Sequence, residues 1–156
     1  MTDSAWRIEK ARHAPNTRSG AGARLVGGRW TSPGRPAIYC AGHLSLAILE
    51  VIVHAPDPAM RSAARVRFRV QFDRTLVERV PDGAVPADFS PRTPYAITRR
   101  IGDEWLRHRH APVLSVPSAI VPLEPNYLLN PEHPKFEHLF WDGGDAITLD
   151  DRLWAT

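Results

Sequence analysis

The sequence predicts a mixed α/β (α+β) fold, in which a single domain has a mixed, mostly antiparallel split sheet and flanking helices. Residues 65–72 alternate polar side chains, three of them arginine, with apolar ones, which is the pattern of a strand with one exposed face. Thr93-Pro94 precedes apolar residues at positions 97, 101 and 105, which predicts a helix. The predicted elements follow no regular βαβ alternation, so a parallel sheet is not expected.

Turn-forming residues and local periodicity place the elements along the chain. Strands are expected at residues 6–9, 38–40, 65–72, 113–116 and 119–121, and helices at 45–54 and 94–108. Ser32-Pro33-Gly34 sets off the second strand, and residues 81–91 form a loop. The part from Pro122 onward is rich in Pro and Asn, with one helical turn expected at residues 134–138. The chain shows no internal repeat and no long low-complexity linker.

Length and cysteine content indicate one domain in a reducing compartment. The 156 residues form one domain, with its core at about 6–153, and are enough for a hydrophobic core. Cys40 is the only cysteine, which excludes an internal disulfide and suits the cytoplasm. Neither a signal peptide nor an apolar run of membrane-spanning length is present, so no membrane association is expected.

The positive net charge of +3 comes almost entirely from arginine. In the densest basic stretch, Arg61 to Arg69, every second residue from Arg65 onward is arginine. This pattern is interpreted as the solvated face of a strand, because nucleic-acid-binding surfaces usually cluster charge on a helix or intersperse exposed aromatics. Direct nucleic-acid binding is therefore not expected. A non-enzymatic alternative is a binding module whose arginine face docks an acidic partner; an unchanged biological effect in Glu50→Ala would favour it.

Glu50 is the most informative residue of the chain. It interrupts an otherwise apolar run from Leu44 to Val53, in which Ser45 is the only other polar residue. Burying an ionised carboxylate is costly unless a partner compensates for it, so this side chain needs a partner or a function. Arg29 and Tyr39 are plausible partners upstream. A surface position is the alternative, but it would leave the apolar neighbours of Glu50 exposed to water.

Other candidate residues have ordinary structural explanations. Arg29 follows a glycine turn in an arginine-rich chain, Tyr39 in a strand is typical of core packing, and Ser118 follows a proline. The seven histidines show neither the zinc-hydrolase nor the zinc-finger spacing, so no metal is expected. Ser118 lacks the Gly-x-Ser-x-Gly motif of a serine hydrolase. On residue pattern alone, only Glu50 stands out.

Several segments together resemble the RES domain family. The matching segments extend from Trp6-Arg7 to Asp151-Arg152-Leu153 in the expected order. They include Gly27-Gly28-Arg29-Trp30, the Tyr39 strand, Leu46 to Val51, Gly102-Asp103-Glu104-Trp105, Val116-Pro117-Ser118-Ala119, Asn126 to Pro131 and His133-Pro134. The family is known as toxins of bacterial toxin–antitoxin pairs that consume NAD, with a fold similar to ADP-ribosyltransferases such as diphtheria toxin. The resemblance implies that fold and activity here.

The resemblance also implies site residues. Arg29, Glu50 and Ser118 fall on the Arg, Glu and Ser for which the family is named, and Tyr39 falls on its active-site tyrosine. Thr31 departs from the pattern, because an Asn commonly follows the tryptophan. Arg29, Glu50 and Ser118 are thus expected to be catalytic, and Arg29, Tyr39, Ser118 and Gly28 to bind NAD.

The side chains suit cleavage of the nicotinamide–ribose bond. Positive charge develops on the ribose in the transition state, and Glu50 can stabilise it. The planar guanidinium of Arg29 offers paired donors to a diphosphate, and Gly28 lets the backbone approach the ligand. Tyr39 offers a flat face, and Ser118 a hydroxyl that can bond to the amide or a ribose hydroxyl. The tyrosine and serine would position the substrate.

The sequence therefore predicts a toxin that degrades NAD, as a phosphorylase or a glycohydrolase. NAD is a substrate, inorganic phosphate is a candidate co-substrate, and no prosthetic group is expected. An ADP-ribosyltransferase that modifies a protein is the competing class, but arginine-directed transferases have an acid two residues before the catalytic Glu, where this chain has Ile48. The resemblance implies an antitoxin with a helix-turn-helix (Xre-type) domain that occludes the NAD cleft, and a homodimer of the toxin within the complex.

Overall fold

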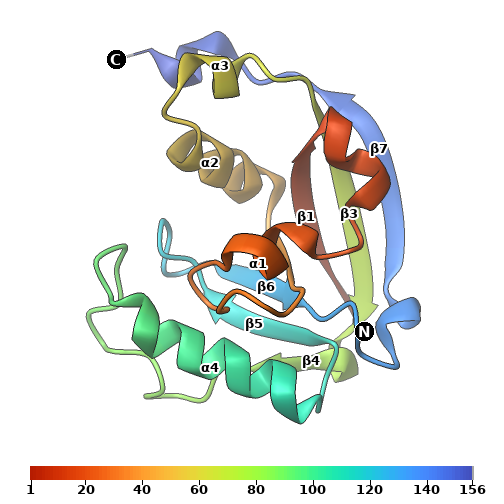
Figure 1. Cartoon of the computed structure of the whole chain (residues 1–156), viewed down its shortest axis with the longest axis vertical. Coiled ribbons are helices and arrows are strands. Elements are labelled where there is room, and N and C mark those ends of the chain that lie inside the picture. The colour runs from red at the N-terminus through yellow and green to blue at the C-terminus, as the bar shows by residue number, and fades with distance from the viewer. Residues whose placement is uncertain (156) are drawn as a thin grey trace.

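The computed structural model describes residues 1–155, and its centre is a seven-stranded sheet in the order β4-β5-β6-β2-β1-β3-β7 (Figure 1). Neighbouring strands are antiparallel except β4 and β5. The strands are β1 (Thr2–Lys10), β2 (Ile38–Ala41), β3 (Arg65–Asp73), β4 (Val77–Arg79), β5 (Val113–Pro117), β6 (Pro125–Leu129) and β7 (Phe140–Ile147). The predicted mixed, mostly antiparallel sheet is confirmed.

The sheet is nearly divided between β1 and β2. These strands pair at a single position, Trp6 opposite Ala41, whereas β1 pairs with β3 along its whole length. Beyond Trp6 the strands diverge, and the Arg7 guanidinium donates a 3.0 Å hydrogen bond to the Tyr39 carbonyl oxygen. A side chain thus satisfies a backbone acceptor that a continuous ladder would have paired. The split separates a β4-β5-β6-β2 half from a β1-β3-β7 half.

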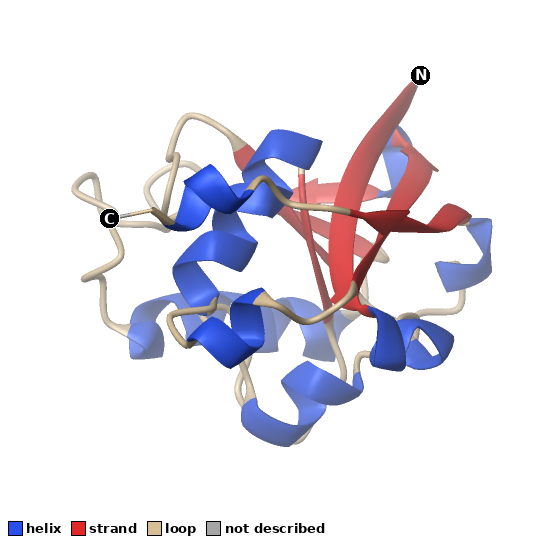
Figure 2. Cartoon of the chain, turned by 90° about the horizontal axis from the view of Figure 1, so that it is seen from above, coloured by secondary structure: helices blue, strands red, loops and turns tan. Residues whose placement is uncertain are grey.

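Helices cover one face of each half. The longest is α4 (Tyr95–His108), whose Trp105 and Leu106 pack with Trp30 and with Leu114 and Leu128 of the first half. α2 (Leu44–His54) packs Leu46 and Ala47 against the strand residues around the split. Figure 2 shows several helices to the left of and below the strands, and further short helices to their right. The shorter helices are α1 (Ala21–Val26), α3 (Pro58–Arg61), η1 (Ala11–Asn16), η2 (Arg74–Leu76), η3 (Phe136–His138) and η4 (Asp151–Trp154).

The opposite face of the sheet holds the two halves together. Val70 and Phe72 of β3 share one buried cluster with Ile38 of β2 and Tyr127 of β6, and Phe136 from η3 covers it. Burial of apolar area stabilises such a cluster by roughly 25 cal/mol per Å². The halves therefore stay joined on this face although their backbone ladder is reduced to a single residue pair.

The structure corrects several expectations about individual elements. Residues 119–121 form a turn rather than a strand, because Ser118 Oγ accepts hydrogen bonds from the Ile120 and Val121 N–H groups, both at 3.1 Å. The strand follows as β6, within the Pro- and Asn-rich part. β4, β7, α1 and α3 were not predicted; in β7, Gly143 and Gly144 interrupt the alternation and adopt positive φ.

The interpretation of the basic strand as a solvated face is wrong in part. Arg65 is buried, and its guanidinium donates to the carbonyls of Arg61 and Ala63, both at 2.9 Å. Arg67 and Arg69 lie over the Trp6 ring at 5.8 and 5.7 Å from its centroid. Packing of guanidinium groups on an indole ring replaces part of their hydration.

No helix within residues 1–155 is both long and apolar enough to cross a bilayer.

Candidate active site

A cavity of about 620 Å³ opens where β1 and β2 diverge. β1 and β2 form its floor, α2 forms one wall, and the segment from α1 to Trp30 forms another. The turn after Ser118 and the start of α4 complete the rim. Binding sites for small molecules usually have volumes of roughly 300–1,000 Å³. The polar side chains in the cavity are therefore the candidates for chemistry.

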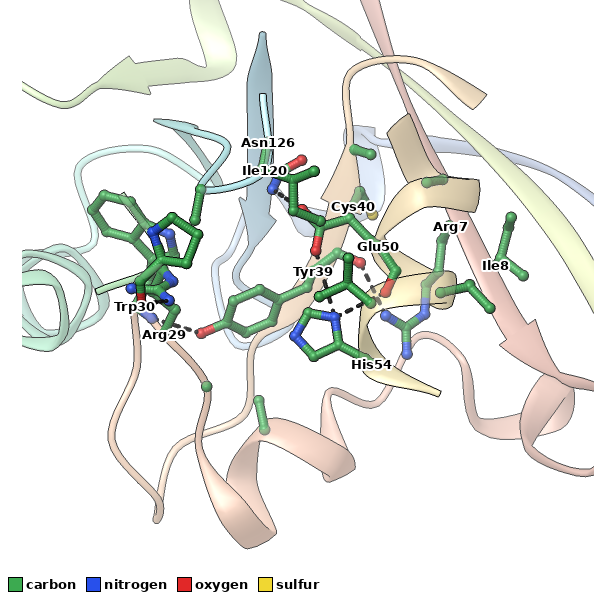
Figure 3. Close-up of a pocket in the computed structure, with 18 of the residues that line it drawn as sticks. Arg7, Ile8, Arg29, Trp30, Tyr39, Cys40, Glu50, His54, Ile120 and Asn126 are labelled. Atoms are coloured by element: carbon green, nitrogen blue, oxygen red, sulfur yellow. Dashed lines mark hydrogen bonds and ion pairs between the residues drawn. The ribbon is translucent and has the colours of Figure 1, made fainter. Parts of the chain in front are cut away.

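Glu50 projects from α2 into this cavity (Figure 3). Its side chain is 27% exposed, and Oε2 lies 3.7 Å from His54 Nδ1. Asn126 of β6 donates a 2.8 Å hydrogen bond from Nδ2 to Glu50 Oε1. The partner that Glu50 requires is thus an amide, not Arg29. The apolar neighbours of Glu50 in α2 are not all shielded from water, because Leu49 and Val53 are 39% and 57% exposed.

His54, one helical turn after Glu50, also lines the cavity. Its Nδ1 lies 2.8 Å from the Glu50 carbonyl oxygen. A carbonyl accepts and never donates, so Nδ1 carries the proton in this contact. The neutral ring therefore keeps its lone pair on Nε2, where it can accept a proton.

Tyr39 lines the cavity, and its hydroxyl is hydrogen-bonded to the loop that contains Trp30 and Thr31. The Trp30 N–H donates to this hydroxyl at 3.2 Å, and Thr31 Oγ1 lies 2.8 Å from it. Thr31, the residue that departs from the family pattern, thus supplies a hydrogen bond in this loop. Burial raises the pKa of Tyr39, opposed by the Thr31 and Trp30 bonds and by the charge of Arg99. The phenol is neutral at physiological pH.

Gly28 packs directly against the same tyrosine. A Cβ atom at this position would lie 2.5 Å from the Tyr39 hydroxyl oxygen, closer than any real contact allows. Glycine is therefore required for the close approach of the loop to the ring. Gly28 lines the cavity and accepts a 2.8 Å hydrogen bond from Arg99 Nε through its carbonyl oxygen.

Arg29 lies toward the other side of Tyr39 from Glu50 in the view of Figure 3. Its guanidinium donates to the carbonyls of Thr93 at 3.2 Å and Pro91 at 3.0 Å. It also lies 4.6 Å from the centroid of the Tyr95 ring. Arg29 thereby holds the segment before α4 against the cavity and contributes positive charge there.

Ser118 is fully buried and does not itself line the cavity. Its hydroxyl oxygen accepts the two backbone bonds that form the turn at Ala119 and Ile120, and both of these residues do line the cavity. The hydroxyl that was expected to be catalytic and to bind NAD thus lies behind the cavity wall and holds the turn that forms it.

Comparison with known proteins identifies the family. The model of the RES domain family matches residues 4–147. The chain belongs to the RES domain family. Among its relatives is a protein of Photorhabdus laumondii named "Toxin Res", 37% identical over 126 residues, which cover 81% of this chain and 80% of the relative. Another is the "Prs ADP-ribosylating toxin" of Sphingobium sp., 33% identical over 148 residues and covering 86% of each chain.

The fold is also found in a solved structure. The crystal structure of the M. tuberculosis MbcT–MbcA toxin–antitoxin complex contains a chain with a TM-score of 0.75 and 20% sequence identity. The match covers 100% of this chain and 91% of that one. At this identity the likeness shows the fold alone, and it agrees with the mixed, mostly antiparallel sheet of this RES domain.

The RES domain brings most of the expected site residues to one cavity. Gly28, Arg29, Tyr39 and Glu50 all line it, although they come from three separate segments of the chain. Ser118 lies behind its wall. Cys40, which was not predicted as a site residue, also borders the cavity, and burial raises the pKa of this thiol to about 12.

Residue pattern alone missed four polar groups of the cavity, namely Arg7, His54, Arg99 and Asn126. Arg7 and Asn126 fall in segments that carry the family resemblance, but nothing in the sequence assigned them a contact. His54 lies four residues after Glu50, so helical spacing was an available signal. Arg99 is followed by another arginine in α4, and the sequence offers no basis for choosing between them.

Proposed function

We propose that this RES domain cleaves NAD at the nicotinamide–ribose bond and acts as a toxin. The observation that supports this most directly is Glu50, a carboxylate held by Asn126 inside a cavity that three arginines also line. A site that cleaves a nicotinamide dinucleotide requires a negative group beside the ribose, which becomes cationic, and positive groups beside the diphosphate. This cavity has both.

Glu50 supplies the electrostatic part of the reaction. As the bond to nicotinamide breaks, the leaving group takes the electron pair and positive charge develops on the ribose ring. A carboxylate fixed beside that carbon stabilises the transition state more than the substrate, and such a contact is typically worth about 3 kcal/mol. The Asn126 hydrogen bond fixes the carboxylate in advance, so little reorganisation is needed.

The remaining site residues bind and orient the substrate. Tyr39 presents its ring to the nicotinamide or ribose while Thr31 and Trp30 hold its hydroxyl. Arg29 and the Gly28 backbone face the diphosphate. Ser118 sets the turn that carries Ala119 and Ile120.

The acceptor is water or inorganic phosphate. In either reaction an oxygen of the acceptor bonds to the ribose carbon that nicotinamide leaves. Attack by water is easier if a base removes its proton, and the Nε2 lone pair of His54 is available in this cavity. Position 48, two residues before Glu50, is isoleucine, which favours a small acceptor over an arginine side chain.

The toxin assignment extends from the relatives to this chain. The P. laumondii relative is named a toxin, and the M. tuberculosis neighbour forms a toxin–antitoxin complex. We infer that a cognate antitoxin with an Xre-type helix-turn-helix domain covers the cavity, that the toxin is a homodimer in the complex, and that it acts in the cytoplasm. Exposed Val26 and Val53 at the cavity rim, 68% and 57% exposed, offer apolar area for such a partner.

A second candidate is ADP-ribosylation of a protein. The Sphingobium relative is named an ADP-ribosylating toxin, and its identity to this chain is 33%. Transfer to a protein uses the same bond cleavage and differs in the acceptor alone. Both reactions release nicotinamide, so the product must be followed.

One assay separates these reactions. The purified protein is incubated with NAD, with and without phosphate, and nicotinamide and the ribosyl product are measured together. ADP-ribose as sole product indicates hydrolysis, a product phosphorylated on the ribose carbon indicates phosphorolysis, and label on added cell protein indicates transfer. Glu50→Gln is expected to slow nicotinamide release by about a hundredfold or more. Unchanged release in Glu50→Gln would overturn the proposal.

A further inference from the structure

Two arginines in the cavity lie against one aromatic ring at the start of α4. The guanidinium carbon of Arg29 is 4.6 Å from the centroid of the Tyr95 ring, and that of Arg99 is 5.2 Å from it. All three residues line the cavity. Contact with a ring face orients a guanidinium and stabilises its positive charge.

The two guanidinium groups differ in the donors they have left for a ligand. Both terminal nitrogens of Arg29 donate to loop carbonyls, at Thr93 and Pro91. Arg99 donates from Nε to the Gly28 carbonyl oxygen, and within residues 1–155 its terminal nitrogens have no hydrogen-bond partner. Arg99 is half-buried and lines the cavity, so its guanidinium is not sealed off from a ligand there.

The positive charge of Arg99 also has no acidic partner among residues 1–155. Arg7 is paired with Glu9, and within residues 1–155 no carboxylate forms an ion pair with Arg99 or Arg29. The anionic residue that lines the cavity is Glu50, whose carboxylate bonds to Asn126. A pair of oriented arginines without acidic partners is an anion-binding arrangement.

We propose that Arg99 is a phosphate-binding residue of this cavity, and that it provides the principal contact to the diphosphate of a nucleotide ligand. Its Nε bond to Gly28 and its contact with Tyr95 hold the guanidinium in place, and its terminal N–H groups donate to the phosphate oxygens. Arg29 adds charge and holds residues 91–93 in position. The identity of the ligand as a dinucleotide rests on the proposed function.

The test uses ADP as the probe and adenosine as its phosphate-free counterpart, with dissociation constants measured by isothermal titration calorimetry on the full chain. Arg99→Ala is expected to weaken ADP binding at least about tenfold, because a charge-assisted bond to phosphate is lost, and to leave adenosine binding unchanged. Arg100→Ala is the matched control: Arg100 is the next residue of α4, it is exposed, and it does not line the cavity.

A second variant distinguishes the loss of the positive charge from a displacement of the Gly28 loop. Arg99→Gln removes the charge but keeps an amide N–H that can reach the Gly28 carbonyl, and it is expected to weaken ADP binding as Arg99→Ala does. Equal ADP affinity in the wild type, Arg99→Gln and Arg99→Ala would overturn the inference. So would an equal loss for ADP and adenosine in both variants, which would indicate a damaged cavity.

The outcome is independent of the assay for the proposed function. If NAD is not cleaved but ADP binding depends on Arg99, the proposed function fails and the phosphate site stands. If NAD is cleaved but neither variant changes the ADP affinity or the KM for NAD, the phosphate site fails and the proposed function stands.

Discussion

Asn126 Nδ2 lies 2.8 Å from Glu50 Oε1, and this hydrogen bond joins β6 to α2 across 76 positions of the chain. The other polar atom of the same side chain, Asn126 Oδ1, is buried without a hydrogen-bond partner among residues 1–155. A buried acceptor without a partner costs about 1–3 kcal/mol. The fold therefore gains little from Asn126, and the contact serves the position of Glu50.

Asn126→Leu is expected to separate activity from stability. The substitution removes the donor to Glu50 and also the unpaired oxygen, so nicotinamide release should fall by about tenfold while the free energy of unfolding changes by less than about 1 kcal/mol. Steady-state kinetics and urea unfolding measure the two effects. A loss of activity that is fully explained by unfolded protein would contradict the positioning role.

Gly102→Ala is expected to destabilise the protein strongly. A Cβ atom at this position of α4 would lie 1.8 Å from the Trp30 carbonyl oxygen, so the helix and the loop that carries Arg29 would have to separate. We expect a loss of about 3 kcal/mol in unfolding free energy. Gly22→Ala in α1 is the control, since a Cβ there would meet no atom of another segment within 4 Å, and it should stabilise by about 0.5–1 kcal/mol. Similar thermal shifts for the two variants would argue against this packing.

Because of Cys40, the free energy of unfolding is expected to fall at alkaline pH. Burial raises the pKa of this thiol from 9.0 to about 12, so the unfolded chain loses the proton before the folded chain does. The contribution of the protonated thiol to the free energy of unfolding is fully present below pH 9 and is lost as pH rises from 9 toward 12. At pH 10 the loss is about 1.4 kcal/mol.

Urea unfolding at pH 8 and pH 10 of the wild type and Cys40→Ala tests this dependence. The buried tyrosines also titrate at high pH, but they are common to both proteins. The wild type should lose about 1.4 kcal/mol more than Cys40→Ala between the two pH values. Equal losses would show that the thiol does not carry the effect.

Arg7 is expected to stabilise the split between β1 and β2. Its guanidinium bonds to Thr17 Oγ1 at 3.0 Å and to the Tyr39 carbonyl at 3.0 Å, and it is paired with Glu9. Arg7→Leu leaves the carboxylate of Glu9, which is 16% exposed, without its partner, and should cost about 3 kcal/mol.

A double-mutant cycle isolates the ionic part of this effect. Adding Glu9→Gln to Arg7→Leu removes the unpaired charge, so the double variant should be more stable than the sum of the two single losses predicts, by about 1 kcal/mol or more. Strict additivity in urea unfolding would mean that Arg7 acts through its backbone contact alone.

Local patterns in the sequence predicted elements where one periodicity dominates. Alternation at residues 65–72 identified β3, and the apolar spacing after Thr93-Pro94 identified α4 to within one residue at its start. Residues 119–121 were misassigned because an apolar composition does not distinguish a strand from a turn, and the Ser118 hydroxyl decides for the turn. β7 was missed because its two glycines with positive φ break the alternation.

The sequence by itself determined the fold class, the family and the anomaly of Glu50, because these depend on residue types and spacing within short segments. The tertiary structure decided which groups meet: Asn126 rather than Arg29 pairs with Glu50, Ser118 is buried behind the cavity wall, and Arg99 rather than Arg100 faces the cavity. These contacts join α2 to β6 and the Gly28 loop to α4. Their physical basis is the packing of segments far apart in the chain, which no local periodicity records.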